Sequence, residues 1–418
     1  MGMELVRGTK EYTPEEQEER EELLLRLIEV FKLYGYKPLE TPILQKLETL
    51  TAKYGGGEEI VKEIFKLKDL GGRDLGLRFD LTVPLARFIS ARPNLRMPFK
   101  RYEYGKVFRN GPVKTGRLRE FIQCDVDIVG SSSLLAEVEL LMLAGEFFKS
   151  IGLDIEILLN DIRLLKSIVR SIGIKDEEQI TSIILTIDKL EKIGREGVLK
   201  ELVEKGLEKS EAEKLLELCS KTVEKLESEL DEEGRNALND LKRIKELCPG
   251  NIKITPSLAR GLSYYTGPIF EIYTVDKRYR NAISAGGRYD NMIGMYSKKK
   301  EVIPAVGISF GIDSIIAALK ILGIKKEKER RGVFIKPITG FEEKAIETAR
   351  AIRSKGIPCS IDLSNKSLKA SLRYADSEDY RYVIIIGKEE ANSGLLTIKD
   401  LEKGIEEKKR IEVFLGLQ

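Results

Sequence analysis

Apolar positions near the start of the chain follow the period of an α-helix. Thr13, Pro14 and Glu16 supply a hydroxyl N-cap, a proline at the first helical position and a glutamate at the third, which together form a capping box. Apolar residues then recur at three- and four-residue spacing until Gly35. The sequence predicts a one-sided helix there, followed by an extended segment, residues 36–43, whose prolines suit the edge of a sheet.

Three pieces between residues 75 and 130 show strand-like patterns: LGLRFDLT, PFKRYEYGKVFR and EFIQCDVDIVG. The last two flank the turn-prone segment GPVKTGRLR, so they predict an antiparallel pair joined by a basic loop. In the second strand of the pair, alternation places Gln123, Asp125 and Asp127 on one face and apolar residues on the other. Such a polar face borders either water or a polar site.

The rest of the chain divides into three regions. Residues 175–249 are charged and helical in pattern and predict an inserted helical module. Strand patterns resume over residues 252–311 and lead into a predicted apolar helix, residues 312–322. After a charged run interpreted as a solvated linker, residues 325–331, strands and helices alternate, which predicts a small, separate α/β domain.

Composition narrows the class of protein. At 418 residues the chain exceeds the size of a single hydrophobic core, and no apolar run is long enough to span a bilayer. The N-terminal segment lacks the apolar stretch of a secretory signal, so a cytoplasmic protein without a membrane partner is expected. The four cysteines stand far apart and indicate neither a disulfide framework nor a zinc site, so no structural metal is expected.

Charge and residue usage add one strong exclusion. The formal net charge of +3 neither requires nor excludes a nucleic-acid partner, because a local basic patch can bind phosphate on a nearly neutral molecule. The chain contains no histidine, which excludes every mechanism that uses a protein histidine as base, nucleophile or metal ligand. Serine hydrolases with the usual triad and histidine-ligated zinc enzymes are therefore excluded.

Several segments, in order along nearly the whole chain, resemble those of the histidyl-tRNA synthetase family of class II aminoacyl-tRNA synthetases. VRGTKEY and YGYKPLETPIL resemble the family's opening and motif 1, with Pro42 as the dimer-interface proline. FRNGPVKTGRLREFIQCDVDIVG resembles motif 2, and AVGISFGID resembles motif 3. RGLSYYTGPIFE and AGGRYD are similar to the two peptides that distinguish histidine-specific enzymes. Taken alone, the Tyr-Tyr pair in the first peptide would be interpreted as core aromatics.

The resemblance implies an α+β fold. An antiparallel catalytic sheet flanked by helices is expected over residues 1–325, with a helical insertion at about 170–250, and an α/β anticodon-binding domain over residues 326–418. It also implies a homodimeric histidine–tRNA ligase. Such an enzyme activates L-histidine with ATP, presented as its Mg²⁺ complex, and transfers the histidyl group to the 3′ end of tRNA(His).

Activation joins two anions, because the histidine carboxylate attacks the α-phosphorus of ATP and expels pyrophosphate. Positioned cations are the main requirement, and no general base is needed. The resemblance implies that Arg109, in the first motif 2 strand, holds the α-phosphate and that Arg260 bridges phosphate and carboxylate. Arg117 and Arg119 would serve the loop, ATP or the acceptor end of tRNA, with a plain surface charge as the alternative for Arg117. Arg288 would contact phosphate or tie its hairpin together.

Histidine recognition requires partners for both imidazole nitrogens and for the α-ammonium group. By the resemblance, Asp127 accepts a hydrogen bond from one ring nitrogen, Tyr265 meets the other, and Tyr264 helps to wall the pocket. The residues implied to bind the α-amino group are Asp80, Thr82 and Gln123. Buried partners for both ring nitrogens reject apolar analogues, since the wrong ligand leaves those partners unpaired.

Three positions depart from the family pattern. Ser314 stands where motif 3 carries an arginine for the γ-phosphate, Ser263 replaces an aspartate, and Gly111 replaces an acidic residue. These departures leave a second function open: a catalytically weakened paralogue resembling the histidine-sensing regulatory subunit of ATP phosphoribosyltransferase. Such subunits generally lack the anticodon-binding domain. A third alternative is an RNA-binding regulator that uses the C-terminal domain without ATP-dependent chemistry.

Overall fold

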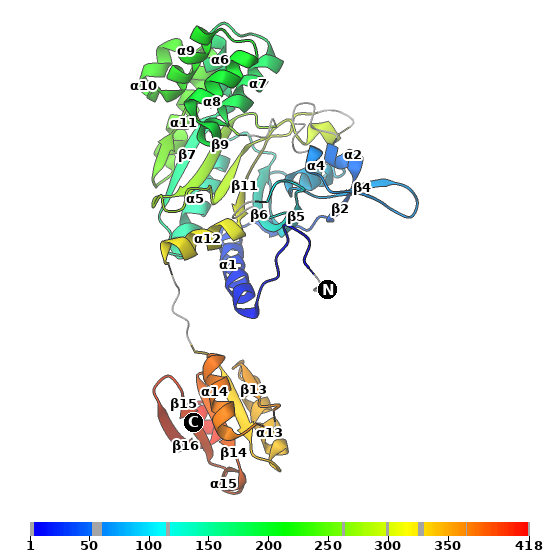
Figure 1. Ribbon diagram of the computed structural model, residues 1–418, viewed down its shortest axis with the longest axis vertical. Coiled ribbons are helices and arrows are strands. Elements are labelled where there is room, and N and C mark those ends of the chain that lie inside the picture. The colour runs from blue at the N-terminus through cyan, green and yellow to red at the C-terminus, as the bar shows by residue number, and fades with distance from the viewer. Residues whose placement is uncertain are drawn as a thin grey trace. The chain divides into compact units, whose positions relative to one another are not determined.

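The computed structural model describes residues 4–51, 61–113, 118–260, 264–297, 301–324, 330–364 and 366–416. The chain divides into two compact units, Met1–Ile324 and Lys325–Gln418 (Figure 1). Each unit is built around a sheet of its own. The site predicted from the sequence lies in the first unit.

An eight-stranded sheet organises the first unit, in the order β1-β5-β6-β11-β10-β9-β7-β8. The β1–β5 and β7–β8 pairs are parallel and the other pairs are antiparallel. The edge position of β1, next to the prolines, confirms the prediction for this segment. The strands are β1 (Lys37–Pro38), β5 (Phe99–Phe108), β6 (Glu120–Val129), β7 (Ile155–Asp161), β8 (Ile252–Ile254), β9 (Pro268–Thr274), β10 (Ser284–Arg288) and β11 (Ala305–Gly311).

Helices α1 (Pro14–Leu33), α5 (Leu135–Ser150) and α12 (Ile312–Leu322) pack together against the central strands of this sheet (Figure 1). The predicted capping box opens α1: Thr13 accepts a hydrogen bond from the Glu16 backbone N–H, and the Glu16 carboxylate accepts one from Thr13. The helices predicted near the two ends of this unit are therefore correct.

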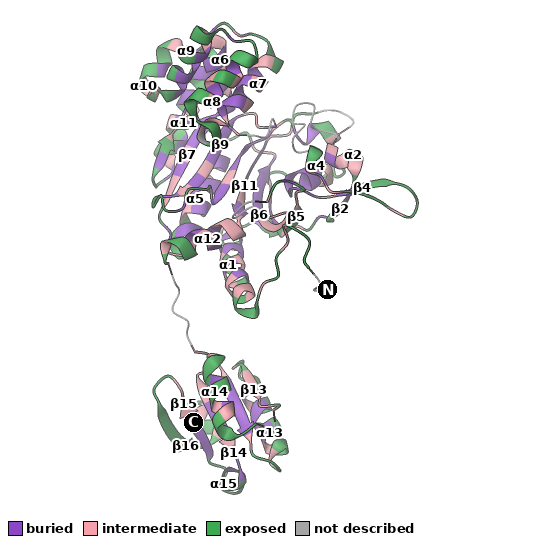
Figure 2. Ribbon diagram, in the orientation of Figure 1, coloured by how far each residue is buried: buried purple, intermediate pink, exposed green. Residues whose placement is uncertain are grey.

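Aromatic rings fill the layer between these helices and the sheet. The Phe310 ring of β11 lies 5.8 Å from that of Phe31 in α1, 5.5 Å from Phe147 and 5.9 Å from Phe148 in α5. All four side chains are fully buried. Figure 2 shows the buried residues running along the central strands and the facing sides of the helices. This layer fixes the position of β11, which carries part of the predicted site.

The predicted helical module is present between β7 and β8. Its helices gather at the top of Figure 1, beside β7 and β9, and bury the apolar stripe that the three-to-four repeat predicted. They are α6 (Ile162–Ser171), α7 (Glu177–Ile187), α8 (Leu190–Glu204), α9 (Lys209–Ser220), α10 (Val223–Leu226), the 3-10 turn η1 (Glu227–Glu229) and α11 (Glu232–Leu247).

The predicted strand LGLRFDLT is only partly correct. Strand β4 (Asp74–Leu77) lies between β2 (Leu44–Lys46) and β3 (Lys66–Lys68) in a three-stranded sheet, with α2 (Leu47–Thr51) beside it. Beyond Leu77 the prediction is wrong, because Arg78 turns into a buried ion pair and Asp80 accepts a hydrogen bond from the Val83 backbone N–H. Helix α4 (Thr82–Ser90) begins there.

The second unit is a five-stranded sheet in the order β13-β12-β14-β15-β16. Its first three strands are parallel, which fits the predicted α/β domain, whereas β15 and β16 add an antiparallel hairpin that the sequence did not predict. The elements are β12 (Val333–Pro337), α13 (Glu342–Arg353), β13 (Cys359–Ile361), α14 (Leu368–Ser377), β14 (Tyr382–Ile386), α15 (Lys388–Ser393), β15 (Leu396–Asp400), β16 (Ile405–Lys409) and α16 (Ile411–Phe414). No described helix combines the length and apolar character needed to cross a membrane.

Because each unit has a separate core, a core defect should act on one unit only. Phe310→Ala should destabilise the first unit by about 3–5 kcal/mol, since it leaves a cavity among three other aromatic rings. Hydrogen exchange resolved by peptide should then accelerate within residues 1–324 and stay unchanged within 325–418. The matched variant Phe334→Ala, in the core of the second unit, should give the reverse. Uniform acceleration across both units would contradict this.

Candidate functional site

The face of β6 predicted to be polar lies on the side of the sheet away from α1, α5 and α12. Cys124 and Val126 point into the core that these helices cover. Gln123, Asp125 and Asp127 point to the other side, and only 3% of Asp125 and 2% of Asp127 are exposed. Two carboxylates buried so deeply do not border open water. Of the two alternatives, the structure therefore supports a polar site.

Small residues form the floor beside this polar face. Each polar residue of β6 lies opposite a small residue of β11, in the pairs Gln123–Gly311, Asp125–Ser309 and Asp127–Gly307. A Cβ atom at Gly307 would collide with Oδ1 of Asp127, so only glycine allows this approach. Ala285 and Gly287 of β10 continue the floor, and Glu271 of β9 lies in register with Ala285. The result is a floor of short side chains between acidic groups on β6 and β9.

A chain of buried ion pairs runs along the same face of the sheet, from β5 to β6. Arg78 contacts Glu103 at 2.9 Å, Glu103 contacts Arg101 at 3.3 Å, and Arg101 contacts Asp127 at 2.8 Å. The Tyr289 hydroxyl donates a hydrogen bond to the other oxygen of Asp127. Burial raises the pKa of Asp127, and the Arg101 guanidinium opposes that rise. Burial would also lower the pKa of Arg101, but Asp127 and Glu103 outweigh it, so the guanidinium stays charged.

The same network holds the turn that carries Asp80 and Thr82. Arg101 Nη2 donates a hydrogen bond to the Leu81 carbonyl at 3.1 Å, and Asp80 Oδ1 accepts one from the Val83 backbone N–H at 3.0 Å. Asp80 and Thr82 are both buried against the sheet. The structure therefore brings this turn to the polar face of β6, as the resemblance implied for residues of one pocket.

Two acceptor atoms on the polar face have neither a hydrogen bond nor an ion pair among the described residues. Gln123 donates a hydrogen bond to the Ser309 hydroxyl at 3.0 Å, but its Oε1 is buried and has no partner. Asp125 is hydrogen-bonded to Ser309, yet its Oδ1 is likewise buried without one. Burial, followed by the charge of Asp127, raises the pKa of Asp125 to about 8. Buried acceptors without donors suit a ligand that brings N–H groups.

The tyrosine pair lies beside this face, where the charge of Asp125 acts on Tyr265. Tyr264 is a core aromatic, packed edge-on to Tyr289 at 6.0 Å between ring centroids. Its ring lies 4.6 Å from that of Tyr265. Burial raises the pKa of Tyr265, while the adjacent Arg260 guanidinium lowers it. Arg260 itself forms an ion pair with Glu271.

A pocket of about 260 Å³ opens beside the tyrosines. Its lining includes Arg260, Tyr264 and Tyr265, together with Arg163 and Lys166 of α6. A larger hollow of about 610 Å³ lies on α1 and the end of α5 and contains none of the residues that the sequence singled out. We therefore place the candidate site at the tyrosine pair and the adjoining face of β6.

The motif 2 arginines occupy the far end of the β5–β6 pair. Arg109 follows the last residue of β5 instead of lying within it, donates from Nε to the Phe79 carbonyl at 3.1 Å, and stacks over the Phe121 ring at 5.2 Å. Arg119 donates to the Gly111 carbonyl at 3.2 Å. Arg117 lies outside the described residues, as does Ser263.

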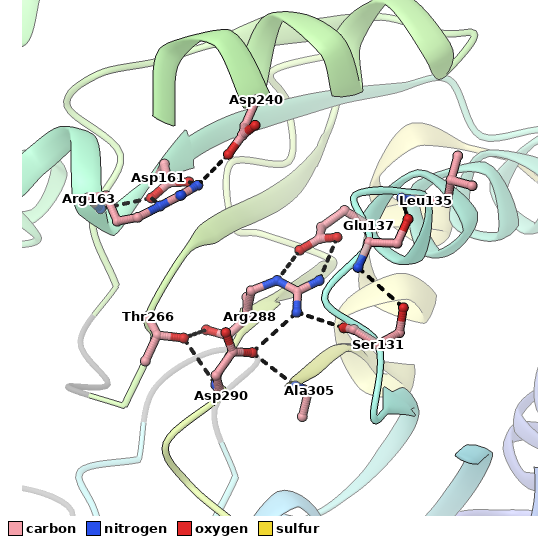
Figure 3. A network of polar contacts seen from close by, with 11 residues as sticks. Ser131, Leu135, Glu137, Asp161, Arg163, Asp240, Thr266, Arg288, Asp290 and Ala305 are labelled. Atoms are coloured by element: carbon pink, nitrogen blue, oxygen red, sulfur yellow. Dashed lines mark hydrogen bonds and ion pairs between the residues drawn. The ribbon is translucent and has the colours of Figure 1, made fainter. Parts of the chain in front are cut away.

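Arg288 is held entirely within the chain by the contacts shown in Figure 3. Its Nε and Nη2 form a two-point ion pair with Glu137 at 2.6 and 2.8 Å. Its Nη1 donates to the Ser131 carbonyl at 2.9 Å and to Asp290 at 3.2 Å. These contacts favour the hairpin-tying role over the phosphate-binding one. Its assignment to ATP stays a prediction, with every guanidinium nitrogen already bonded.

Two family models match the chain. The model described as histidyl-tRNA synthetase matches residues 8–315, and the anticodon binding domain model matches residues 332–415. The chain belongs to the histidyl-tRNA synthetase family. Histidine–tRNA ligase 1 of Bacillus cereus is 42% identical over 98% of this chain and 97% of its own length.

Solved structures agree with this membership. Histidyl-tRNA synthetase from Nostoc superposes with a TM-score of 0.83 at 28% identity, covering 100% of this chain and 99% of that one. A Bacillus halodurans protein titled ATP phosphoribosyltransferase regulatory subunit/histidyl-tRNA synthetase superposes with a TM-score of 0.74 at 22% identity, covering 92% and 98%. That second likeness shows a shared fold only. The family resemblance and the α+β fold class are thus confirmed.

The sequence did not point to the charged residues and the tyrosine that support the candidate site. They are Arg78, Arg101, Glu103, Glu271 and Tyr289, and all lie within segments that predicted strands or resembled family motifs. The available signal was a charged residue inside an apolar strand, as in PIFEIYT and PFKRYEYGKVF. A buried charge in such a strand requires a partner, and that partner is a site candidate.

Loss of Arg101, the central residue of the buried ion pairs, should strongly destabilise the fold. Arg101→Met should lower the free energy of unfolding by about 3–5 kcal/mol, because Asp127 and Glu103 would lose a buried counter-charge. Chemical denaturation of the purified protein measures this. Arg278→Ala removes an exposed arginine whose ion pair is with Asp276 and should change stability by less than about 1 kcal/mol. Equal effects from both variants would contradict the assigned role of Arg101.

Proposed function

We propose that the chain is a histidine–tRNA ligase. Family membership and the curated ligases of similar length support it. The observation that carries the proposal is the buried polar face of β6, with its acceptors Gln123 Oε1 and Asp125 Oδ1, next to the tyrosine pair and Arg260. A site of this kind fits a small ligand with several N–H donors beside an anionic partner.

In the first step, the carboxylate of histidine attacks the α-phosphorus of ATP. An oxygen–phosphorus bond forms to give histidyl-adenylate, and the bond to the bridging oxygen breaks to release pyrophosphate with Mg²⁺. We assign the two cations at the reacting groups to Arg109 and Arg260. Burial lowers the pKa of Arg260, but the Glu271 carboxylate outweighs it and keeps the pKa raised. Glu271 therefore keeps the Arg260 guanidinium charged and in position before the substrates arrive.

The substrate histidine would lie on the small-residue floor. Asp127 is assigned to one ring nitrogen and Tyr265 to the other, with Tyr264 as a wall. The carboxylate of Asp127 already meets Arg101 and Tyr289, but its two oxygens offer about four acceptor sites, so a ring N–H can be added. The α-amino group would meet Asp80, Thr82 and Gln123.

In the second step, the terminal hydroxyl of tRNA(His) attacks the carbonyl carbon of the adenylate and AMP leaves. The second unit, matched by the anticodon-binding model, would bind the other end of the tRNA. Arg119 would serve ATP or the acceptor end. Magnesium is assigned to the ATP complex. Within the described residues no group of three His, Cys, Asp or Glu side chains could hold a metal ion of its own. We further propose a cytoplasmic homodimer.

The histidine-sensing regulatory subunit is not favoured. Subunits of that kind generally lack an anticodon-binding domain, whereas this chain carries one and is 42% identical to a histidine–tRNA ligase over nearly its full length. The RNA-binding regulator predicts no ATP-dependent chemistry, so the same assay tests both alternatives.

Histidine-dependent exchange of pyrophosphate into ATP tests the proposed function directly. The purified protein should support exchange with histidine and with no other amino acid. Arg260→Ala and Arg109→Ala should each slow exchange by about 100-fold or more, since each removes a charge aimed at the transition state. Arg278→Ala should match the unaltered protein. Histidine binding without exchange would instead indicate a sensor.

The missing motif 3 arginine gives a second test. Ser314 is the third residue of α12, next to Asp313, whose carboxylate pairs with Arg20. Ser314→Arg should lower the KM for ATP by about tenfold, because one charged hydrogen bond to the γ-phosphate is worth about 1.5 kcal/mol or more. The KM for histidine should stay unchanged. A Ser314→Gln variant adds size without charge and should not improve ATP binding.

A further inference from the structure

Asp125 is the one carboxylate of the polar face to which the resemblance assigns no role. It lies between Gln123 and Asp127 on β6, and its partners across the register are Glu103 on β5 and Ser309 on β11. All these side chains share one face, because directly opposed residues of neighbouring strands point the same way. Asp125 is therefore placed at the centre of the proposed histidine site.

The two carboxylates next to Asp125 already have charged partners. Glu103 is held between Arg78 and Arg101. Asp127 is held between Arg101 and Tyr289. Asp125 differs, because Ser309 provides one hydrogen bond and its Oδ1 has no partner in the part of the chain that the structure describes, although only 3% of the residue is exposed. An unsatisfied buried carboxyl oxygen is costly, and a ligand that supplies a donor removes the cost.

The geometry of neighbouring acceptors matches an ammonium group. An ammonium offers three N–H donors. The face offers Gln123 Oε1 and Asp125 Oδ1, neither of which has a hydrogen bond among the described residues, and the charge of Asp80 is near enough to act on Asp125. Two acceptors on one strand at two-residue spacing can therefore meet one cation, with a further carboxylate beside them.

We propose that Asp125 is a further substrate-binding residue, whose Oδ1 accepts an N–H of the α-ammonium group of histidine and whose proton leaves as that cation arrives. The carboxyl proton passes to solvent, the ammonium keeps its three protons, and no covalent bond changes. The inference rests on the proposed function, since it takes histidine as the substrate.

Proton release follows from the environment of Asp125. Burial and Asp127 raise its pKa to about 8, so most molecules hold the proton at pH 7. A cation within hydrogen-bonding distance favours the ionised form and reverses that shift. The charged and titratable groups around it are Asp80, Arg101, Glu103, Asp127, Tyr265 and Tyr289.

Calorimetric titration in two buffers of different ionisation enthalpy measures both affinity and proton release. The unaltered protein should release about one proton more per histidine at pH 7 than Asp125→Asn, which should bind histidine about tenfold or more weakly. Imidazolepropionate, which has the ring and carboxylate of histidine but no amino group, should bind both proteins equally. Asp362→Asn makes the same change at a buried carboxylate of the second unit and should match the unaltered protein.

The stability of the free protein separates a binding role from a structural one. A folded pKa near 8 against about 3.9 in the unfolded chain means that the folded state holds the extra proton between these values, so stability falls as pH rises from about 4 to 8. Asparagine cannot ionise. Asp125→Asn should therefore raise the melting temperature by about 2 °C or more at pH 8 and by less at pH 5.

The outcomes are distinct. Unchanged histidine affinity or proton release in Asp125→Asn would overturn the inference, as would equal weakening of imidazolepropionate or a lowered melting temperature at pH 8. If Asp125→Asn does not fold, Asp125→Ala carries the same expectations for both ligands. Failure of the unaltered protein to bind histidine would overturn the proposed function itself, whereas pyrophosphate exchange with unchanged Asp125→Asn affinity would overturn this inference alone.

Discussion

The buried chain of charges from Arg78 to Asp127 is the constraint on which the site depends. Taking charged groups out of water costs several kcal/mol each, and the mutual attraction of a buried pair rarely exceeds that cost. What the network provides is position. Arg101, with no exposed surface, joins β5, β6 and the Leu81 turn in one set of contacts. Loss of one member would leave its neighbours charged and unpaired, so these segments hold one arrangement.

The sheet supplies the rest of the site through the size of its side chains. Helices and aromatic rings fill one face, whereas β10 and β11 carry glycine, alanine and serine on the other. The Asp127 carboxylate lies directly against Gly307 and the Tyr265 ring lies against Gly287, so the glycines allow these side chains to approach the backbone closely. The acidic groups of β6 stand on one side of this floor and Glu271, paired with Arg260, on the other. The same residue alternation thus builds a packed core and an open floor.

Residues with similar charges have different roles because their partners differ. Arg288 is the last residue of β10 and Arg260 precedes β9. Arg288 is surrounded by Glu137, Ser131 and Asp290, whereas Arg260 lies at a pocket. Likewise Asp127 has a partner on each oxygen, and Asp125 keeps one oxygen without any. Burial and partner geometry decide which charge supports the fold and which can meet a substrate.

The local elements and the family follow from the amino-acid sequence without knowledge of the fold. A capping box and helical period predicted α1, an apolar segment predicted α12, alternation predicted the two faces of β6, and ordered motifs predicted the fold class, because these signals depend on neighbours a few residues away. Tertiary structure alone decided the end of β4 at Leu77, the β15–β16 hairpin, the containment of Arg288 and the pairing of Arg101. Each of these depends on partners distant along the chain. The sequence does not show whether a carboxylate or guanidinium is paired with another side chain or with a ligand.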